Sequence, residues 1–146
     1  MSWETSHWIY AITPFAAWLV AGISKFIINS IKSKQLAFGL IGYGGMPSNH
    51  SAIVSSTAMM IALREGIQHP AFGVAVTLAF IVLLDANSLR RQVGKQAERI
   101  NQLANSSQQS PQQPPLRERM GHTQLEIAAG IFTGAVVAVI VNQLLG

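Results

Sequence analysis

Four long stretches without a single charged side chain constrain this 146-residue chain more than any other feature. They cover residues 5–24, 35–63, 66–84 and 127–146, and they are 20, 29, 19 and 20 residues long. An α-helix needs about 20 mostly apolar residues to cross the hydrocarbon core of a bilayer, and it satisfies its own backbone polar groups there. The sequence therefore predicts an all-α integral membrane protein, a bundle of about four transmembrane helices in one domain over residues 1–146.

Composition agrees with a membrane protein and disfavours other classes. Charged residues make up 11% of the chain, against roughly 25% in an ordinary soluble domain. A soluble enzyme, a nucleic-acid-binding domain and a disordered chain are all disfavoured. The net charge is +4, but the basic residues lie beside apolar spans, so we expect them to face lipid headgroups and not nucleic acid. The chain has no cysteine, which excludes disulfides and thiolate zinc sites.

The first half of the chain predicts two helices separated by a glycine-rich loop. The first helix is expected from about residue 8 to residue 31. Residues 35–45 are apolar but hold four glycines, which favours a buried, re-entrant or interfacial loop. The second helix should start within residues 47–51 and end at Arg64. It barely spans a bilayer at about 1.5 Å per residue, so we expect neighbouring helices to shield it.

The second half predicts a long rod, a polar linker and a last helix. The third helix should begin near Pro70, stay apolar to Leu84 and continue out of the membrane without a break. Residues 105–115 are polar and of low complexity, with three prolines, which indicates a flexible solvated linker. The last helix is expected over residues 123–145.

If all four helices cross, one face of the membrane collects nearly every basic residue. The positive-inside rule makes that face cytoplasmic, in an inner or plasma membrane, with both termini outside. Basic residues recruited to bind an anion would produce the same asymmetry. Arg64 is left on the opposite face, and the cytoplasmic set comprises Lys25, Lys32, Lys34, Arg90, Arg91, Lys95, Arg99, Arg117 and Arg119.

Polar residues within or beside the spans gather at the same face. Ionisable groups at membrane depth are costly and usually mark a function. The set comprises Lys25, Ser48, His50, Asp85, Arg90, Arg91, His122 and Glu126.

Residues 44–52, Gly-Gly-Met-Pro-Ser-Asn-His-Ser-Ala, begin the second helix with two glycines and a proline. The first amides of a helix have no carbonyl partner, and together with the positive end of the helix dipole they form a site for an anion such as phosphate. The alternative is a glycine turn followed by a serine N-cap, with His50 as a surface histidine.

His122 and Glu126 are four residues apart, so on a helix they share a face. A carboxylate there can hold an imidazole in one tautomer and raise its basicity, as a nucleophile or a base requires. The alternative is a solvated pair at a helix start. Asp85 beside two arginines can likewise be an interfacial cluster that ends a span, and Lys25 can extend its ammonium group to the headgroups.

A metal site is disfavoured at this face. Oxygen-rich metal sites need several carboxylates, zinc usually takes three or four ligands, and the surrounding cations would repel a metal while attracting phosphate. We expect no cofactor.

Three segments in order resemble the divergent branch of the type-2 phosphatidic acid phosphatases, relatives of the vanadium haloperoxidases. They are residues 44–52, residues 85–97 (Asp-Ala-Asn-Ser-Leu-Arg-Arg-Gln-Val-Gly-Lys-Gln-Ala) and residues 116–123 (Leu-Arg-Glu-Arg-Met-Gly-His-Thr). The resemblance covers nearly the whole chain. It implies a metal-independent phosphatase that acts on lipid-type phosphates through a phosphohistidine.

The resemblance also implies roles for individual residues. His122 is the expected nucleophile, Glu126 its support and His50 the general acid. The expected phosphate-binding residues are Lys25, Ser48, Asn49, Arg90 and Arg91, with Asp85, Lys34 and Arg117 in supporting positions. Asn49 stands where the main family has glycine, and Ser88 to Arg91 lie far upstream of His122 instead of just before it.

We therefore predict a membrane phosphatase whose substrate is a lipid phosphate, such as phosphatidylglycerophosphate or phosphatidic acid, or an isoprenyl diphosphate. Its partners are membrane lipids and, because four helices form a thin shell, further copies of the chain in a homo-oligomer. The rival is a non-catalytic protein that binds anionic lipid or phosphate. A transporter or channel is weaker, because the ionisable residues gather at one face. A soluble haloperoxidase is the least favoured.

Overall fold

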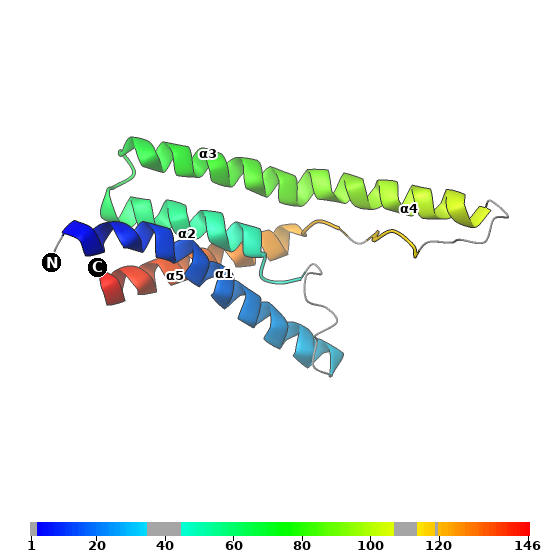
Figure 1. The fold of residues 1–146 in the computed structure, drawn as a ribbon, viewed down its shortest axis with the longest axis horizontal. Coiled ribbons are helices and arrows are strands. Elements are labelled where there is room, and N and C mark those ends of the chain that lie inside the picture. Colours follow the sequence, from blue (N-terminus) through cyan, green and yellow to red (C-terminus); the bar gives the residue numbers. More distant parts are fainter. Residues whose placement is uncertain (1–2, 35–44, 107–113, 119) are drawn as a thin grey trace.

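The computed structural model describes residues 3–34, 45–106, 114–118 and 120–146, with the backbone alone at residues 3–6 and 33. Every regular element in these ranges is helical, which confirms the predicted all-α class (Figure 1). The helices are α1 (Trp3–Ser33), α2 (Asn49–Arg64), α3 (Pro70–Leu84), α4 (Arg90–Ser106) and α5 (Gln124–Leu145), and one π-helical turn, η2 (Asp85–Leu89), joins α3 to α4. The described part of the chain thus forms four helical segments.

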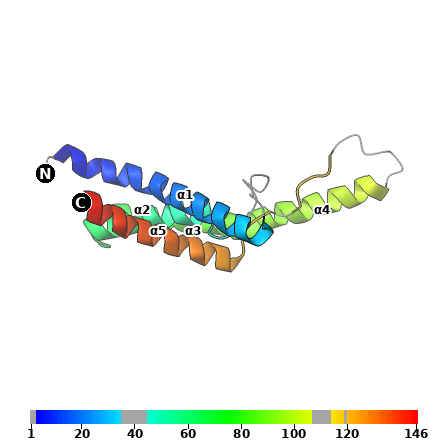
Figure 2. The same ribbon diagram turned by 90° about the horizontal axis from the view of Figure 1, so that it is seen from below.

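Three of these segments are long and apolar enough to cross a membrane: 7–32 within α1, the α3–α4 segment and α5. At 16 residues, α2 is shorter, about 24 Å long at 1.5 Å per residue. It packs against α1, α3 and α5, so its neighbours shield it as expected. Both chain ends lie at the same end of the bundle, away from α4, in both views (Figures 1 and 2).

The packing is that of a protein surrounded by lipid. Small residues fill the contacts between helices, and one buried cluster consists of Ala17, Ala21, Ala52 and Val137. Large apolar side chains point outward, including Phe15 on α1 and Phe132 on α5, which are 71% and 72% exposed. Since lipid tails are as apolar as these side chains, outward aromatic residues cost nothing in a bilayer, whereas small residues allow helices to approach closely.

The predicted rod is present. In η2 the Arg90 N–H donates to the Asp85 carbonyl oxygen five residues earlier, so the helix continues from α3 into α4 without a break (Figure 1). α4 continues to Ser106, so residues 105 and 106, the first two of the segment expected as a linker, are helical. The first helix also begins earlier than expected, at Trp3.

Two predicted loops fall largely outside the described residues. They are the glycine-rich loop over residues 35–45, of which Gly45 is described, and the linker, of which residues 107–113 are not. Residues 114–118 run beside α4. There the Asn101 side chain donates to the Leu116 carbonyl oxygen at 2.8 Å and accepts from the Leu116 N–H at 2.9 Å.

Candidate active site

The predicted polar face forms where α2 begins, α3 ends and α5 begins. At the start of α2, Ser48 is the N-cap, and its fully buried hydroxyl accepts from the Ser51 N–H at 3.4 Å. The backbone N–H of Ser48 donates to the Glu126 carbonyl oxygen at 3.0 Å. The serine N-cap, which the sequence offered as the alternative to an anion site, is therefore present. The backbone N–H of the same serine joins the start of α2 to the first turn of α5.

Two glycines of α5 permit this close approach. A methyl group at Gly130 would overlap the Ser48 carbonyl oxygen, and one at Gly134 would overlap that of Ala52. Small residues spaced four apart let helix backbones pack directly in lipid. The spacing of Gly130 and Gly134 therefore fixes the start of α2, and with it His50, against α5.

His122 is held by the turn just before α5. Gly121 has φ of +88°, a left-handed conformation that favours glycine, and a Cβ there would lie 2.8 Å from Cγ of Arg91. The backbone N–H of His122 then donates to the Ala86 carbonyl oxygen of η2 at 3.0 Å. These contacts attach the predicted nucleophile to the rod.

The ring of His122 faces Glu126. Nδ1 of His122 lies 3.3 Å from Oε2 of Glu126, and that oxygen also accepts from the Thr123 N–H at 2.9 Å in a capping box. The imidazole is only 8% exposed, so the alternative of a solvated pair was wrong. Because the carboxylate accepts the Nδ1 proton, the neutral ring carries its lone pair on Nε2, the form that a nucleophile needs.

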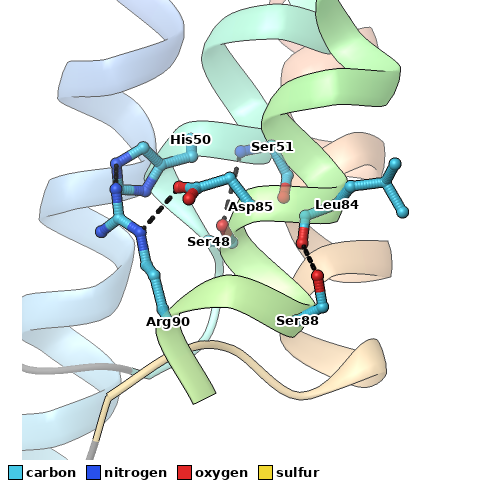
Figure 3. A network of polar contacts seen from close by, with 7 residues as sticks. All are labelled: Ser48, His50, Ser51, Leu84, Asp85, Ser88 and Arg90. Carbon is cyan, nitrogen blue, oxygen red and sulfur yellow. Dashed lines mark hydrogen bonds and ion pairs between the residues drawn. The ribbon is translucent and has the colours of Figure 1, made fainter. Parts of the chain in front are cut away.

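The two predicted catalytic histidines lie side by side. The ring centroids of His50 and His122 are 6.0 Å apart, with the rings tilted by 56°. Nη2 of Arg90 lies 3.3 Å from Nε2 of His50, and Nε of Arg90 pairs with Oδ2 of Asp85 at 3.0 Å (Figure 3). An arginine only donates, so this contact places the proton of a neutral His50 on Nδ1. That Nδ1 is buried without a hydrogen-bond partner in the described part of the chain.

Burial and neighbouring charges together set the protonation state of His122. Burial lowers the pKa of the His122 imidazole, the Glu126 carboxylate opposes that shift, and the cations Lys25 and Arg90 lower the pKa further. The ring is therefore neutral at pH 7, because the ordinary histidine pKa is already about 6.5. Lys25 is half-buried on α1 and lies within electrostatic range of both histidines and Glu126.

Asn49 faces α1, with its amide nitrogen 3.9 Å from the position of a Cβ at Gly22 and its oxygen buried without a partner among the described residues. Three other predicted residues lie at the periphery. Arg91, Lys34 and Arg117 are all exposed, on α4, just after α1 and beside α4 respectively. Arg90 contacts His50, whereas Arg91 is exposed and packs its Cγ against Gly121.

Sequence reasoning assigned no role to three neighbours of the site. Ser51 is fully buried, and its hydroxyl has no partner in the described structure. Oδ1 of Asn87 in η2 is likewise buried without a hydrogen-bond partner among the described residues. Asn29 packs its side chain against Gly45, as Lys25 does one turn earlier on α1. The i,i+4 spacing between Lys25 and Asn29 was the sequence signal that could have identified Asn29 as a neighbour of the site. No group of three or more metal-ligating side chains occurs among the described residues.

Comparison with known proteins agrees with the resemblance seen in the motifs. The sequence pattern of the family described as "Divergent PAP2 family" matches residues 8–137. The "Uncharacterized membrane protein YuiD" of Bacillus subtilis (strain 168) is 32% identical over an alignment that covers 88% of this chain and 90% of that protein. No solved structure matches the chain. With its membrane-spanning helices, the chain is an integral membrane protein that belongs to the divergent PAP2 family.

Proposed function

We propose that this protein is a metal-independent phosphatase that hydrolyses a lipid phosphate or isoprenyl diphosphate through a phosphohistidine on His122. The observation that carries the proposal is the pair of imidazoles of His50 and His122 with ring centroids 6.0 Å apart. Two cationic side chains, Lys25 and Arg90, act on this pair electrostatically. Histidines in such surroundings suit phosphoryl transfer, in which cations and helix amides stabilise charge on the phosphoryl oxygens.

In the first half of the reaction, Lys25, Arg90 and the first amides of α2 hold the phosphoryl oxygens. Phosphate draws the Arg90 guanidinium away from Nε2 of His50, so that His50 can carry a proton as imidazolium. Nε2 of His122 attacks phosphorus and the bond from phosphorus to the leaving oxygen breaks. His50 gives that oxygen its proton, while the Glu126 carboxylate stabilises the charge that develops on His122.

In the second half, water attacks the phosphohistidine. Neutral His50 takes one proton from the water, the nitrogen–phosphorus bond breaks, and inorganic phosphate leaves with His122 restored. Asp85 holds Arg90 in reach of the phosphate, and Ser48 and Asn49 shape the first turn of α2. The exposed cations Arg91, Lys34 and Arg117 attract anionic headgroups to the face that bears the site, which we propose to be cytoplasmic.

The second candidate function is a non-catalytic receptor for anionic lipid or phosphate. The contact between Arg90 and Nε2 of His50 favours it, because a guanidinium at that nitrogen opposes its protonation. In this alternative the same cations hold the anion and no phosphorus–oxygen bond breaks.

The test is phosphate release from phosphatidylglycerophosphate, phosphatidic acid and an isoprenyl diphosphate by protein purified in mild detergent, with and without EDTA. His122→Ala should abolish release, and His7→Ala, which changes an exposed histidine at the far end of the bundle, should leave it intact. Release that resists EDTA and requires His122 supports the phosphatase. If the unmutated protein releases no phosphate from any of these lipids but retains them in a binding assay, the receptor is the better account.

A further inference from the structure

One side of the α3–α4 rod carries a continuous apolar stripe, which on α3 flanks a groove shared with α5. Val76, Phe80 and Leu84 follow one another at one-turn spacing on α3, and all three are exposed. The extra residue of the π-turn η2 places Leu89 one turn after Leu84, and the stripe continues along α4. The exposed fractions of Leu89, Val93, Ile100 and Leu103 are 59%, 41%, 52% and 70%.

Lipid covers this stripe on α3 but not on α4. Five of the 17 residues of α4 are charged, which keeps the helix out of the hydrocarbon core. The rod is continuous, so α4 leads away from the bundle and beyond the ends of α2 and α5 (Figures 1 and 2). The adjacent face of α4 is already covered, since Gly94 contacts the Glu118 carbonyl oxygen and Ala97 is buried. The apolar stripe beside it is left facing water.

The spacing of the stripe is that of a coiled-coil seam. Residues 89, 93, 96, 100 and 103 alternate steps of four and three, which puts Val93 and Ile100 at a positions and Leu89 and Leu103 at d positions. β-branched residues at a with leucine at d favour two parallel strands. Gln96 at the central d position is polar and can pair with its own copy, at some cost in stability relative to leucine.

We propose that α4 docks along this stripe with α4 of a second copy, as a parallel two-stranded coiled coil that continues from the membrane. All copies inserted the same way present α4 at the same height and in the same direction, so identical stripes meet in register. In that register Arg99 lies opposite Ala104 of the other copy, so like charges do not meet. The seam is about 22 Å long at 1.5 Å per residue, and confinement to the bilayer supplies the local concentration that so short a seam needs.

Disulfide trapping tests this directly, because the chain has no cysteine of its own. Single variants Ile100→Cys and Leu103→Cys are oxidised in native membranes beside the controls Glu98→Cys and Gln102→Cys, which lie on the polar face of the same helix. We expect covalent dimer at 100 and 103 at least about tenfold faster than at the controls, because a disulfide needs Cα atoms within about 7 Å. Equal rates at all four positions, or no dimer at 100 and 103, would overturn the proposal.

A second measurement keeps the result independent of cysteine chemistry. Ile100→Glu combined with Leu103→Glu should convert a dimer to a monomer in analytical ultracentrifugation with mild detergent. The matched control is Gln102→Glu combined with Asn105→Glu, two exposed polar-face positions that should leave the dimer intact. If α4 instead lies on the lipid surface, cysteines at 100 and 103 resist a water-soluble maleimide without forming dimer, which contradicts the coiled coil. None of these readouts depends on phosphate hydrolysis.

Discussion

At the end of the bundle that carries both termini, polar side chains of neighbouring helices are paired with each other. The Tyr10 hydroxyl of α1 donates to Glu65 just after α2, and Arg64 donates to Oδ1 of Asn142 on α5 at 3.3 Å. At the opposite end some buried polar atoms are paired between helices, as His50 is with Arg90, but others have no partner in the described structure. All four unpartnered atoms in the described residues lie there, on Asn49, His50, Ser51 and Asn87.

This difference in hydrogen bonding indicates that the two ends of the bundle have different roles. A buried polar group without a partner costs about 1–3 kcal/mol, so these four atoms would be stabilised by a water molecule or a polar ligand at the site. Paired groups at the terminal end hold helices together and leave little to offer a ligand. We therefore expect substitutions at the terminal end to change stability and substitutions at the site end to change activity.

The largest effect is expected for His50→Gln. Loss of a general acid lowers the rate by about 100- to 1,000-fold on lipid phosphates, whose leaving alkoxide needs a proton. On p-nitrophenyl phosphate, whose leaving group is stable without a proton, the loss should be at least about tenfold smaller. The measurement is kcat/KM on both substrates, because this constant reports the half of the reaction in which the leaving group departs, with His7→Gln as the matched change at the terminal end. Equal losses on the two substrates would remove His50 from the role of acid.

A smaller effect is expected for Glu126→Gln, which keeps the capping box because glutamine also serves at that position. Activity requires neutral His122, so it falls as the pH drops through the pKa of that imidazole. Glu126 raises this pKa, so its neutralisation lowers the pKa and the acid limb of kcat/KM moves to lower pH. The rate at pH 7 should fall about tenfold through loss of imidazolium stabilisation. An acid limb that moves to higher pH contradicts the assigned pairing.

The smallest effects separate the two ends most cleanly. Ser51→Ala removes an unpartnered hydroxyl, so the free energy of unfolding in detergent should change by less than about 0.5 kcal/mol. Inhibition by vanadate, an analogue of the phosphoryl group, should weaken about threefold. Tyr10→Phe removes a hydrogen bond to a carboxylate and should cost about 1 kcal/mol of stability with kcat unchanged. If Ser51→Ala destabilises the protein as much as Tyr10→Phe does, the Ser51 hydroxyl is hydrogen-bonded in the folded protein, which contradicts the difference between the two ends.

The helices and the polar face were predictable because their signals are local. Runs without charge locate the spans, Pro47 and Ser48 mark the start of α2, and the i,i+4 spacing of His122 and Glu126 indicates their shared face. The absence of a helix breaker after Leu84 likewise indicated that the rod continues.

The partners of the polar residues depend on contacts that no local pattern carries. The π-turn adds a residue between Asp85 and Leu89, and after it Arg90 contacts His50 while Arg91 contacts Gly121. The side chain of Asn101 holds residue 116 against α4 through two hydrogen bonds, although the two residues are 15 positions apart in the sequence. Both arrangements arise from tertiary packing and become visible only in the folded chain.

The central claim is that His122 becomes phosphorylated during turnover. Protein mixed with a lipid phosphate that it turns over and quenched at alkaline pH, where phosphohistidine survives, would be digested and analysed by mass spectrometry. We predict the added mass of one phosphoryl group on the peptide that contains His122, and its absence in His122→Ala. With p-nitrophenyl phosphate as donor, whose leaving group needs no proton, the adduct should increase in His50→Gln, because His50 also takes the proton from the attacking water. Steady phosphate release with no such adduct in either the unmutated protein or His50→Gln would contradict this account.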